Sequence, residues 1–312
     1  MVDRGTENER EQQAWVRILA ADGIGLATAR TLVRGFGSAC RVITARREEL
    51  VRVLRLGASA ADAVHEAIRC SNPAVESRWL RRRKGRLVPF GDACYPSLLV
   101  ACPDAPGLLR CQGSLPGHGV PCIAVVGSRR ATSYGLRMAA MITAGLVEHG
   151  CWVVSGGARG IDAEVHRTAL RLGGRTACVL GSGLAHPYPS EHRGLFDRIL
   201  EHEGCVLSQF TCRQKPRPGL FPRRNRIVSG MSHAVVVVEA ARRSGALITA
   251  RVAVEEHGRD AMVVPGAADS ASSGGCHAAV QDGWAHLITS AADVIRLLEE
   301  DYSAARALNT VA

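Results

Sequence analysis

The stretch that decides the fold is CIAVVGSRRATSYGLRMAAMITAGLVEHGCWVVSGGARGID, residues 122–162. It opens with five apolar residues, 122–126, and then turns through glycine and polar residues. A helical stretch near 133–149 follows, and a second short apolar run, 152–154, comes next. Short apolar strands bounded by glycines and separated by a helix are typical of a βαβ unit. The pattern therefore predicts two buried parallel strands joined by a crossover helix.

The same alternation continues downstream. We expect further strands at 176–180, 205–207, 234–238 and 261–264, and helices near 161–172, 190–202, 222–231 and 245–257. Repeated βαβ units build an open sheet with helices on both faces. The sequence therefore predicts an α/β fold, a Rossmann-like, doubly wound and mostly parallel sheet.

Upstream of this sheet the pattern changes twice. Residues 1–75 predict a small helical domain of the helix-hairpin-helix or SAM-like type, in which the turn Gly23-Ile24-Gly25 joins two helices. Such a turn can leave backbone N–H groups for a phosphate, or it can be a purely structural joint. Residues 76–119 carry prolines, glycines and the basic run 81–84, which indicates a linker and extended segment with little regular structure. The Rossmann-like domain is expected over 120–312.

The composition is that of a globular protein. Of the 312 residues 46% are hydrophobic and 22% are charged, which argues against disorder and a coiled coil. The apolar runs are far shorter than the roughly 20 residues that span a bilayer, and the polar N-terminus is unlike a signal peptide. The eleven cysteines form no C-x-x-C pair, which favours reduced thiols over a zinc or disulfide framework. We therefore expect a cytoplasmic protein without membrane contact.

Positive charge is concentrated in one segment. The net charge is +10, carried almost entirely by arginine, which suits a phosphate-bearing partner or reflects genome base composition. Residues 209–230 hold six Lys and Arg residues and no acid. Within this segment Pro222 suits the first turn of a helix, which would place four polar residues near its start: Arg223, Arg224, Asn225 and Arg226. The sequence therefore predicts a surface that contacts several phosphates in a row.

Small and polar residues also follow the predicted strands. In a parallel sheet these loops gather at the carboxyl edge, where ligands bind. One loop carries Gly127, Ser128 and Arg129, and the next carries Ser155, Gly156, Gly157 and Arg159. Backbone N–H groups, hydroxyls and guanidinium groups there can hold an anion. G-x-G-x-x-G and the P-loop pattern are both absent from the sequence, so no dinucleotide or other cofactor is expected. His186 and His192 are not one helical turn apart, and no metal site is expected.

Several motifs, in order and spacing, resemble the DprA/Smf family of DNA processing proteins. They are VVGSR (125–129), SGGARGID (155–162), FPRRNRIVSG (221–230), VVVEA (236–240), SGALITA (244–250), VPG (264–266) and GC (275–276). The resemblance implies a Rossmann-like protein that binds and protects incoming single-stranded DNA. It also implies a homodimer that loads the RecA recombinase in natural transformation. Motif matching would place Arg129, the turn 155–157, Arg223, Asn225 and Arg226 at the DNA.

Three positions depart from that family pattern. The family usually has Ser-Gly-Leu where this chain ends the motif with Gly157, and Ser-Glu where this chain has Gln209 in second place. It usually has Gly-Cys-Asn where this chain ends the motif with His277. Gly157 favours an alternative class of protein, the nucleoside-monophosphate phosphoribohydrolases, because these enzymes have a glycine-rich second loop. Those enzymes carry Pro-Gly-Gly-x-Gly-Thr-x-x-Glu, and residues 265–272 here lack its spacing and its glutamate. We therefore expect a binding protein and no enzyme, with the hydrolase as the alternative.

Three polar residues have structural interpretations as well. Arg226 could pair with Glu239 or another buried acid instead of with DNA. Asp162 suits the cap of a helix. His166, on the helix that follows, is expected to be a core histidine and not a catalyst.

Overall fold

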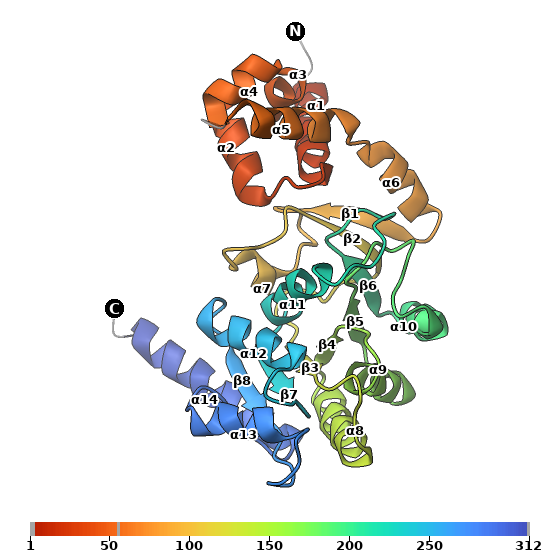
Figure 1. Cartoon of the computed structure of the whole chain (residues 1–312), viewed down its shortest axis with the longest axis vertical. Coiled ribbons are helices and arrows are strands. Elements are labelled where there is room, and N and C mark those ends of the chain that lie inside the picture. The colour runs from red at the N-terminus through yellow and green to blue at the C-terminus, as the bar shows by residue number, and fades with distance from the viewer. Residues whose placement is uncertain (1–3, 55–56, 311–312) are drawn as a thin grey trace.

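The computed structural model describes residues 4–54 and 57–310. A helical region at the N-terminus sits on one end of a nine-stranded sheet with helices on both faces (Figure 1). The strand order is β1-β2-β6-β5-β4-β3-β7-β8-β9. The strands from β3 to β9 pair in parallel, whereas β1 and β2 are antiparallel. The predicted α/β fold with a Rossmann-like, mostly parallel sheet is confirmed.

The parallel strands form where the apolar runs predicted them, except for β9, which was not predicted. They are β3 (Cys122–Val126), β4 (Trp152–Ser155), β5 (Thr176–Val179), β6 (Cys205–Ser208), β7 (Ala234–Val237), β8 (Asp260–Val263) and the short β9 (His286–Leu287). Every residue of β3 to β7 is buried. Side chains on the two faces of the sheet enter separate apolar clusters, which explains why these strands have no polar alternation.

Helices cover both faces of the parallel sheet. They are α8 (Ser133–Glu148), α9 (Ile161–Arg171), α10 (Arg193–Glu201), α11 (Leu220–Gly230), α12 (Gly245–Glu255), α13 (Gly274–Gln281) and α14 (Ala291–Thr310). Thr132 caps α8 by accepting the Gly135 N–H, and Ser244 caps α12 by accepting the Ala246 N–H. Each cap directly follows a loop at the carboxyl edge, so these loops are tied to the helices behind them.

The segment expected to have little regular structure carries two helices and two strands, so that part of the expectation is wrong. It contains α6 (Pro73–Arg81), β1 (Gly85–Pro89), α7 (Ser97–Val100) and β2 (Leu108–Gly113). The two strands form an antiparallel hairpin, and β2 pairs with β6 from Arg110–Ser208 to Gly113–Cys205. The first four residues of β2 are buried, so apolar burial offsets the weak propensity of a Gly- and Pro-rich segment. The division at residues 75 and 119 stays a prediction.

The N-terminal region consists of short helices around their own core. These are α1 (Arg4–Ala20), α2 (Leu26–Phe36), α3 (Ala39–Thr44), α4 (Arg47–Leu54) and α5 (Ala58–Cys70). Ile18, Leu32 and Leu50 are almost fully buried there, together with Leu108 of β2. The predicted turn joins α1 to α2, and Gly23 adopts a φ of 78°, which favours glycine. Among the described helices, none is both long and apolar enough to cross a membrane.

Candidate nucleic-acid interface

The loop after β3 presents an arginine beside an aromatic ring. Gly127 packs against Ile161, whose Cγ1 would lie 2.6 Å from a Cβ at position 127. The Ser128 hydroxyl accepts the Arg130 N–H at 3.1 Å. Arg129 follows and is exposed, and its guanidinium carbon lies 5.2 Å from the centre of the Phe221 ring. A rigid turn therefore holds a cation over an aromatic face, where both can reach an incoming ligand.

The loop after β4 is closed by its own hydrogen bonds. The buried Ser155 hydroxyl donates to the Val125 carbonyl at 2.7 Å. The N–H groups of Gly156 and Ala158 donate to Asp162 Oδ2 at 3.1 and 3.3 Å. Asp162 lies in the first turn of α9, so it holds this loop and does not occupy the cap position. Two of the backbone donors expected for an anion are thus already used inside the protein.

Gly157 and Gly156 are required by close packing in this loop. Gly157 has a φ of 66°, and a Cβ there would lie 2.6 Å from Cys178 Sγ. A Cβ on Gly156 would lie 2.3 Å from Arg224 Nη1. A leucine at position 157, as in the family pattern, would need this loop to take another path. The departure at Gly157 therefore goes with a loop that packs closely against Cys178 and Arg224.

Arg224 faces inward and supports the loop. Only 4% of the residue is exposed, and its Nη1 group donates to the carbonyls of Gly156 and Val179. Burial lowers the pKa of Arg224, although the nearby Asp162 opposes this shift. Burial likewise raises the pKa of Asp162, against the opposing effect of Arg224. The charges of Arg224 and Asp162 influence each other beneath the surface without a direct ion pair. Because Arg224 is buried, it is not an open phosphate contact in this structure.

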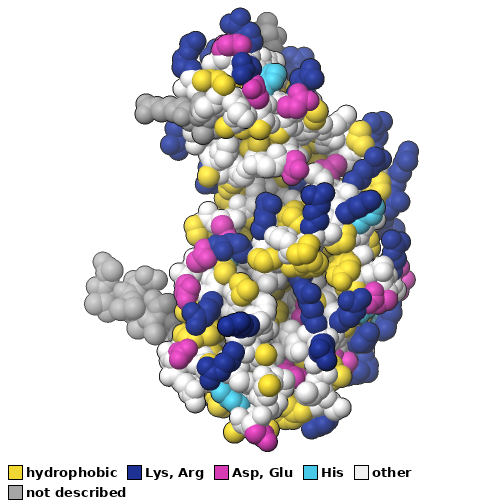
Figure 2. All heavy atoms as spheres, viewed as in Figure 1, with side chains coloured by type: hydrophobic (Ala, Val, Ile, Leu, Met, Phe, Trp, Pro, Cys, Tyr) yellow, Lys and Arg dark blue, Asp and Glu magenta, His cyan; other side chains and the backbone are white. Residues whose placement is uncertain are grey.

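The exposed arginines near this loop lie over aromatic rings. Arg159 lies 5.7 Å from the Tyr188 ring centre and pairs with Glu191. Tyr188 and Phe221 are themselves 5.7 Å apart. A shallow hollow joins these groups and is lined by Arg129, Gly156, Ala158, Arg159, Tyr188, Pro189, Phe221 and Arg224. Figure 2 shows Lys and Arg side chains among hydrophobic ones across this middle part of the molecule. The aromatic partners were missed by the sequence reasoning, because aromatics are only 4% of the chain.

The rest of the basic helix extends the same surface toward the N-terminal helices. Arg223 is exposed and lies 5.4 Å from the Phe210 ring centre. Asn225 is engaged internally, accepting from Arg224 Nε at 3.1 Å and donating to the Gly245 carbonyl at 3.3 Å. A hollow of about 360 Å³ beside Arg223 and Arg226 also includes the turn Gly23-Ile24-Gly25 among its lining residues. Phosphate contact at that turn stays a prediction.

Arg226 pairs with two exposed acids, and not with Glu239 or another buried acid as its structural interpretation expected. Its guanidinium contacts Asp104 and Glu256, whose side chains are 26% and 43% exposed. The hydrogen bond with Glu256 and the one with Asp104 raise the pKa of Arg226. Glu239 instead accepts the Thr132 N–H at 3.0 Å and the Thr132 hydroxyl at 3.2 Å. Arg226 therefore reaches a DNA phosphate only by exchanging carboxylate partners.

Two bridges cross the crevice where a doubly wound sheet usually binds its ligand. That crevice lies between β3 and β7, from which the chain winds in opposite directions. The bonds between Glu239 and Thr132 cross it, and the Tyr134 hydroxyl donates to the Pro265 carbonyl at 2.7 Å. The exposed cations lie instead over the loops after β3 and β4 and along α11. The candidate interface is thus displaced to one side of the usual crevice.

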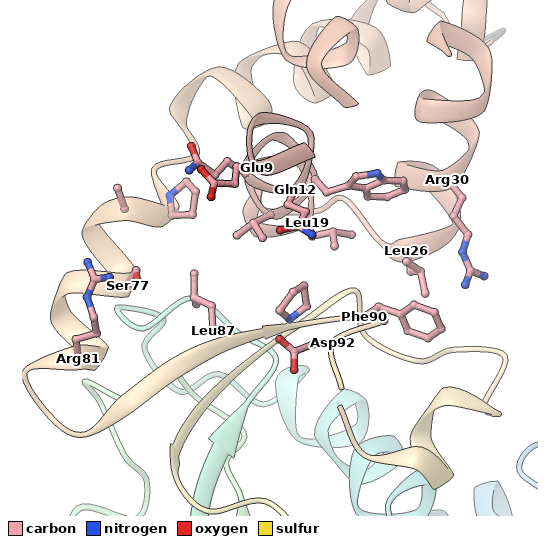
Figure 3. A pocket seen from close by; sticks show the side chains of 17 residues that line it. Glu9, Gln12, Leu19, Leu26, Arg30, Ser77, Arg81, Leu87, Phe90 and Asp92 are labelled. Carbon is pink, nitrogen blue, oxygen red and sulfur yellow. The ribbon is translucent and has the colours of Figure 1, made fainter. Parts of the chain in front are cut away.

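A larger hollow of about 940 Å³ lies between the N-terminal helices and β1 (Figure 3). Its labelled side chains come from both sides, with Leu19 and Leu26 facing Leu87 and Phe90. Arg30, Arg81, Glu9 and Asp92 are also part of its lining. Because acids and bases are balanced there and the walls are largely apolar, this hollow fits a chain of phosphates less well than the arginine surface does.

A doubly wound sheet whose carboxyl edge carries exposed arginines over aromatic rings defines a Rossmann-like protein with an exposed basic surface. Residues 86–299 match the sequence family described as DNA recombination-mediator protein A. The chain belongs to this family, the DprA/Smf DNA processing proteins, as its motifs predicted.

Individual relatives agree with this assignment. Protein Smf of Escherichia coli is 39% identical over 221 residues, which cover 71% of this chain and 59% of that protein. DprA of Streptococcus pneumoniae is 39% identical over 240 residues, which cover 74% of this chain and 84% of that protein. The chain thus spans about three fifths of the Escherichia coli relative.

Two solved structures share the fold. The X-ray structure of Streptococcus pneumoniae DprA has a TM-score of 0.73 at 32% identity, covering 95% of this chain and 98% of that one. DNA processing protein A of Helicobacter pylori has a TM-score of 0.61 at 25% identity, covering 70% and 97%. The first match includes the N-terminal helices as well as the sheet, since it extends over nearly the whole chain.

Proposed function

We propose that this protein binds single-stranded DNA along its exposed arginines and acts as a recombination mediator without catalytic turnover. The observation that carries the proposal is the set of three exposed arginines over aromatic rings: Arg129 over Phe221, Arg159 over Tyr188 and Arg223 over Phe210. Guanidinium groups bind phosphates, and the partly exposed rings of Tyr188 and Phe221 offer faces on which unpaired bases stack. The Helicobacter pylori relative, described by its single-stranded DNA binding mode, supports the same ligand.

Membership of the recombination-mediator family supports a proposal for the cellular role. We propose that a homodimer protects incoming single-stranded DNA in the cytoplasm and loads the RecA recombinase during natural transformation. A dimer would present two arginine surfaces to one strand, and linking two modest sites raises the apparent affinity for a long strand well above that of either one. Affinity should therefore rise steeply once an oligonucleotide bridges both surfaces.

The position of the carboxylates supports binding over hydrolysis. A phosphoribohydrolase needs an acid that can face its substrate. Asp162 is buried and accepts two N–H groups of its own loop, and Glu239 is held by Thr132. Glu191, at the rim, pairs with Arg159. Release of ribose 5-phosphate from nucleoside monophosphates would favour the hydrolase instead.

Titration with oligo-dT, duplex DNA and mononucleotides at several salt concentrations tests the proposed function. We expect preference for the single strand, because stacking faces are useful only for unpaired bases. With four to six phosphates neutralised, log K should fall with log salt with a slope of roughly −3 to −4. Equal or tighter binding to duplex DNA, or a slope near zero, would contradict the proposal.

Replacing Arg129 and Arg223 together with alanine should weaken oligo-dT binding by about 100- to 200-fold, since each charge-assisted contact contributes about 1.5 kcal/mol. Both side chains are exposed, so the thermal midpoint should change little. The matched control replaces the exposed run 81–84 with alanines, which removes twice as many charges. If the control weakened binding more than the double variant did, the interface would lie on the β1 side of the molecule.

A further inference from the structure

Three metal-ligating side chains of different kinds converge outside the arginine surface. Cys102 and Asp104 belong to the loop after α7, and His257 lies just after the end of α12. One donor atom from each residue lies within 4.8 Å of the others. The His257 side chain is fully buried, and Cys102 is 5% exposed. Asp104 and His257 are 153 positions apart in sequence, which is why spacing arguments could not find this cluster.

The hydrogen bonds of His257 direct one ring nitrogen toward the cluster. Nδ1 lies 2.9 Å from the Ser229 hydroxyl, which itself donates to the Arg226 carbonyl at 3.2 Å. Because that hydroxyl uses its hydrogen on the carbonyl, it accepts from Nδ1, which must therefore carry a proton. Nε2 then points at Asp104 Oδ1, 2.9 Å away. A partner that fixes one imidazole nitrogen in this way is typical of metal-ligating histidines.

Asp104 presents one oxygen to the cluster and fixes the other. Oδ1 faces His257, whereas Oδ2 accepts from Arg226 Nε. The two terminal nitrogens of Arg226 are bonded to Glu256. Arg226 therefore orients the carboxylate from behind and leaves Oδ1 as a single ligand atom. The Asp104 side chain is 26% exposed, so solvent and a metal ion can reach this side of the cluster.

Cys102 supplies the third, softer ligand. Its Sγ atom lies 3.5 Å from the Leu98 carbonyl and 3.8 Å from the Gly230 carbonyl, distances that correspond only to weak S–H donation. Loss of the thiol proton would break no strong hydrogen bond. Without a metal, the two negative charges of Asp104 and Glu256 balance the positive charges of Arg226 and a protonated imidazole. A divalent cation that displaces one proton from the sulfur and one from His257 leaves the net charge of the cluster unchanged.

We propose that Cys102, Asp104 and His257 form a zinc site that fastens the loop after α7 to α11 and α12. Sulfur, imidazole nitrogen and carboxylate oxygen are the ligands that Zn²⁺ accepts in four-coordinate sites, with water in the remaining position. Ser229 and Arg226 are the positioning residues behind two of the ligands. The metal would join the loop after α7 to the residues that follow α12, two segments whose ligands Asp104 and His257 are 153 positions apart.

Titration of the tag-free, metal-depleted full-length protein with Co²⁺, followed by its absorption spectrum, tests this site directly. We expect one Co²⁺ per chain, visible bands of tetrahedral cobalt, and a thiolate-to-cobalt charge-transfer band in the near ultraviolet. Stoichiometric Zn²⁺ should abolish all of them and raise the thermal midpoint. A wild-type protein without the charge-transfer band at stoichiometric Co²⁺ would overturn the proposal without recourse to any variant.

Variants then assign the ligands. Cys102→Ser should remove the charge-transfer band and weaken Zn²⁺ binding by at least about 100-fold, since even loss of a group behind a ligand costs 10- to 100-fold. Ser229→Ala should weaken binding by about tenfold while keeping the band. Cys94→Ser, which removes an exposed thiol eight residues upstream of Cys102, is the matched control and should leave the spectrum unchanged. Persistence of the band in Cys102→Ser would place the metal elsewhere.

Discussion

Replacing Arg224 with methionine is expected to destabilise the protein by about 3–5 kcal/mol, because it removes a buried cation near the buried carboxylate of Asp162 together with two buried hydrogen bonds. Methionine retains most of the side-chain volume, so the loss is electrostatic and not a cavity effect. The carbonyls of Gly156 and Val179 also lose their donor. Urea denaturation at pH 7, fitted for the free energy of unfolding, measures the change.

Two further variants separate this effect from DNA contact. Arg223→Met alters the adjacent, exposed arginine and should leave stability within about 0.5 kcal/mol of the wild type. Adding Asp162→Asn to Arg224→Met should restore part of the lost stability, because no charge then remains unpaired. If Arg224→Met were as stable as the wild type but defective in DNA binding, the inward role assigned to Arg224 would be wrong.

The sequence carried a signal for Arg224 that the charge pattern obscured. Positions 224, 227, 228 and 231 follow helical spacing, and the last three are Ile, Val and Met. Arg224 thus occupies the apolar stripe of α11, whereas Arg223 does not. Counting charges grouped both arginines as phosphate contacts, although only one faces solvent. Helical phase, applied to charged as well as apolar residues, would have separated them.

The parallel sheet was predictable because each strand is a continuous apolar run that must be buried on both faces. The antiparallel pair of β1 and β2 was not, because its strands contain Gly and Pro and β2 pairs with β6, about a hundred residues away. The same limit applies to Arg226. Its partners Asp104 and Glu256 lie 122 and 30 positions away, so local pattern could not choose between a carboxylate and a phosphate.

Acidification is expected to destabilise the protein through His166, which lies in α9 and is completely buried. Nδ1 donates to the Thr176 hydroxyl at 2.8 Å, because that hydroxyl uses its own hydrogen on the Val153 carbonyl. Nε2 has no hydrogen-bond partner among the described residues. Burial, together with the nearby His192 and Arg224, lowers the pKa of His166 to about 3. The imidazole is therefore held neutral.

The lowered pKa of His166 fixes the direction of the pH effect. The unfolded chain binds this proton near pH 6.5 and the folded chain only near 3, so the stability is fully present above 6.5 and is lost as the pH falls between these values. At 1.36 kcal/mol per pH unit, the loss from this group reaches about 2 kcal/mol at pH 5. Burial raises the pKa of Asp162, so this group has the opposite effect on the pH dependence of stability. Its contribution is the same in the wild type and in the variant described next.

Replacing His166 with glutamine isolates the effect, because an amide can still donate to Thr176 but does not titrate. The variant should be less stable than the wild type at pH 7, yet its free energy of unfolding should fall by about 2 kcal/mol less between pH 7 and pH 5. Urea denaturation of both proteins at half-unit pH intervals measures the two curves. The difference between the two curves cancels the titration of Asp162 and of the surface carboxylates, which both proteins share. Parallel curves would contradict the prediction, because they would mean that His166 is already protonated in the folded protein at pH 7 or remains solvated within α9.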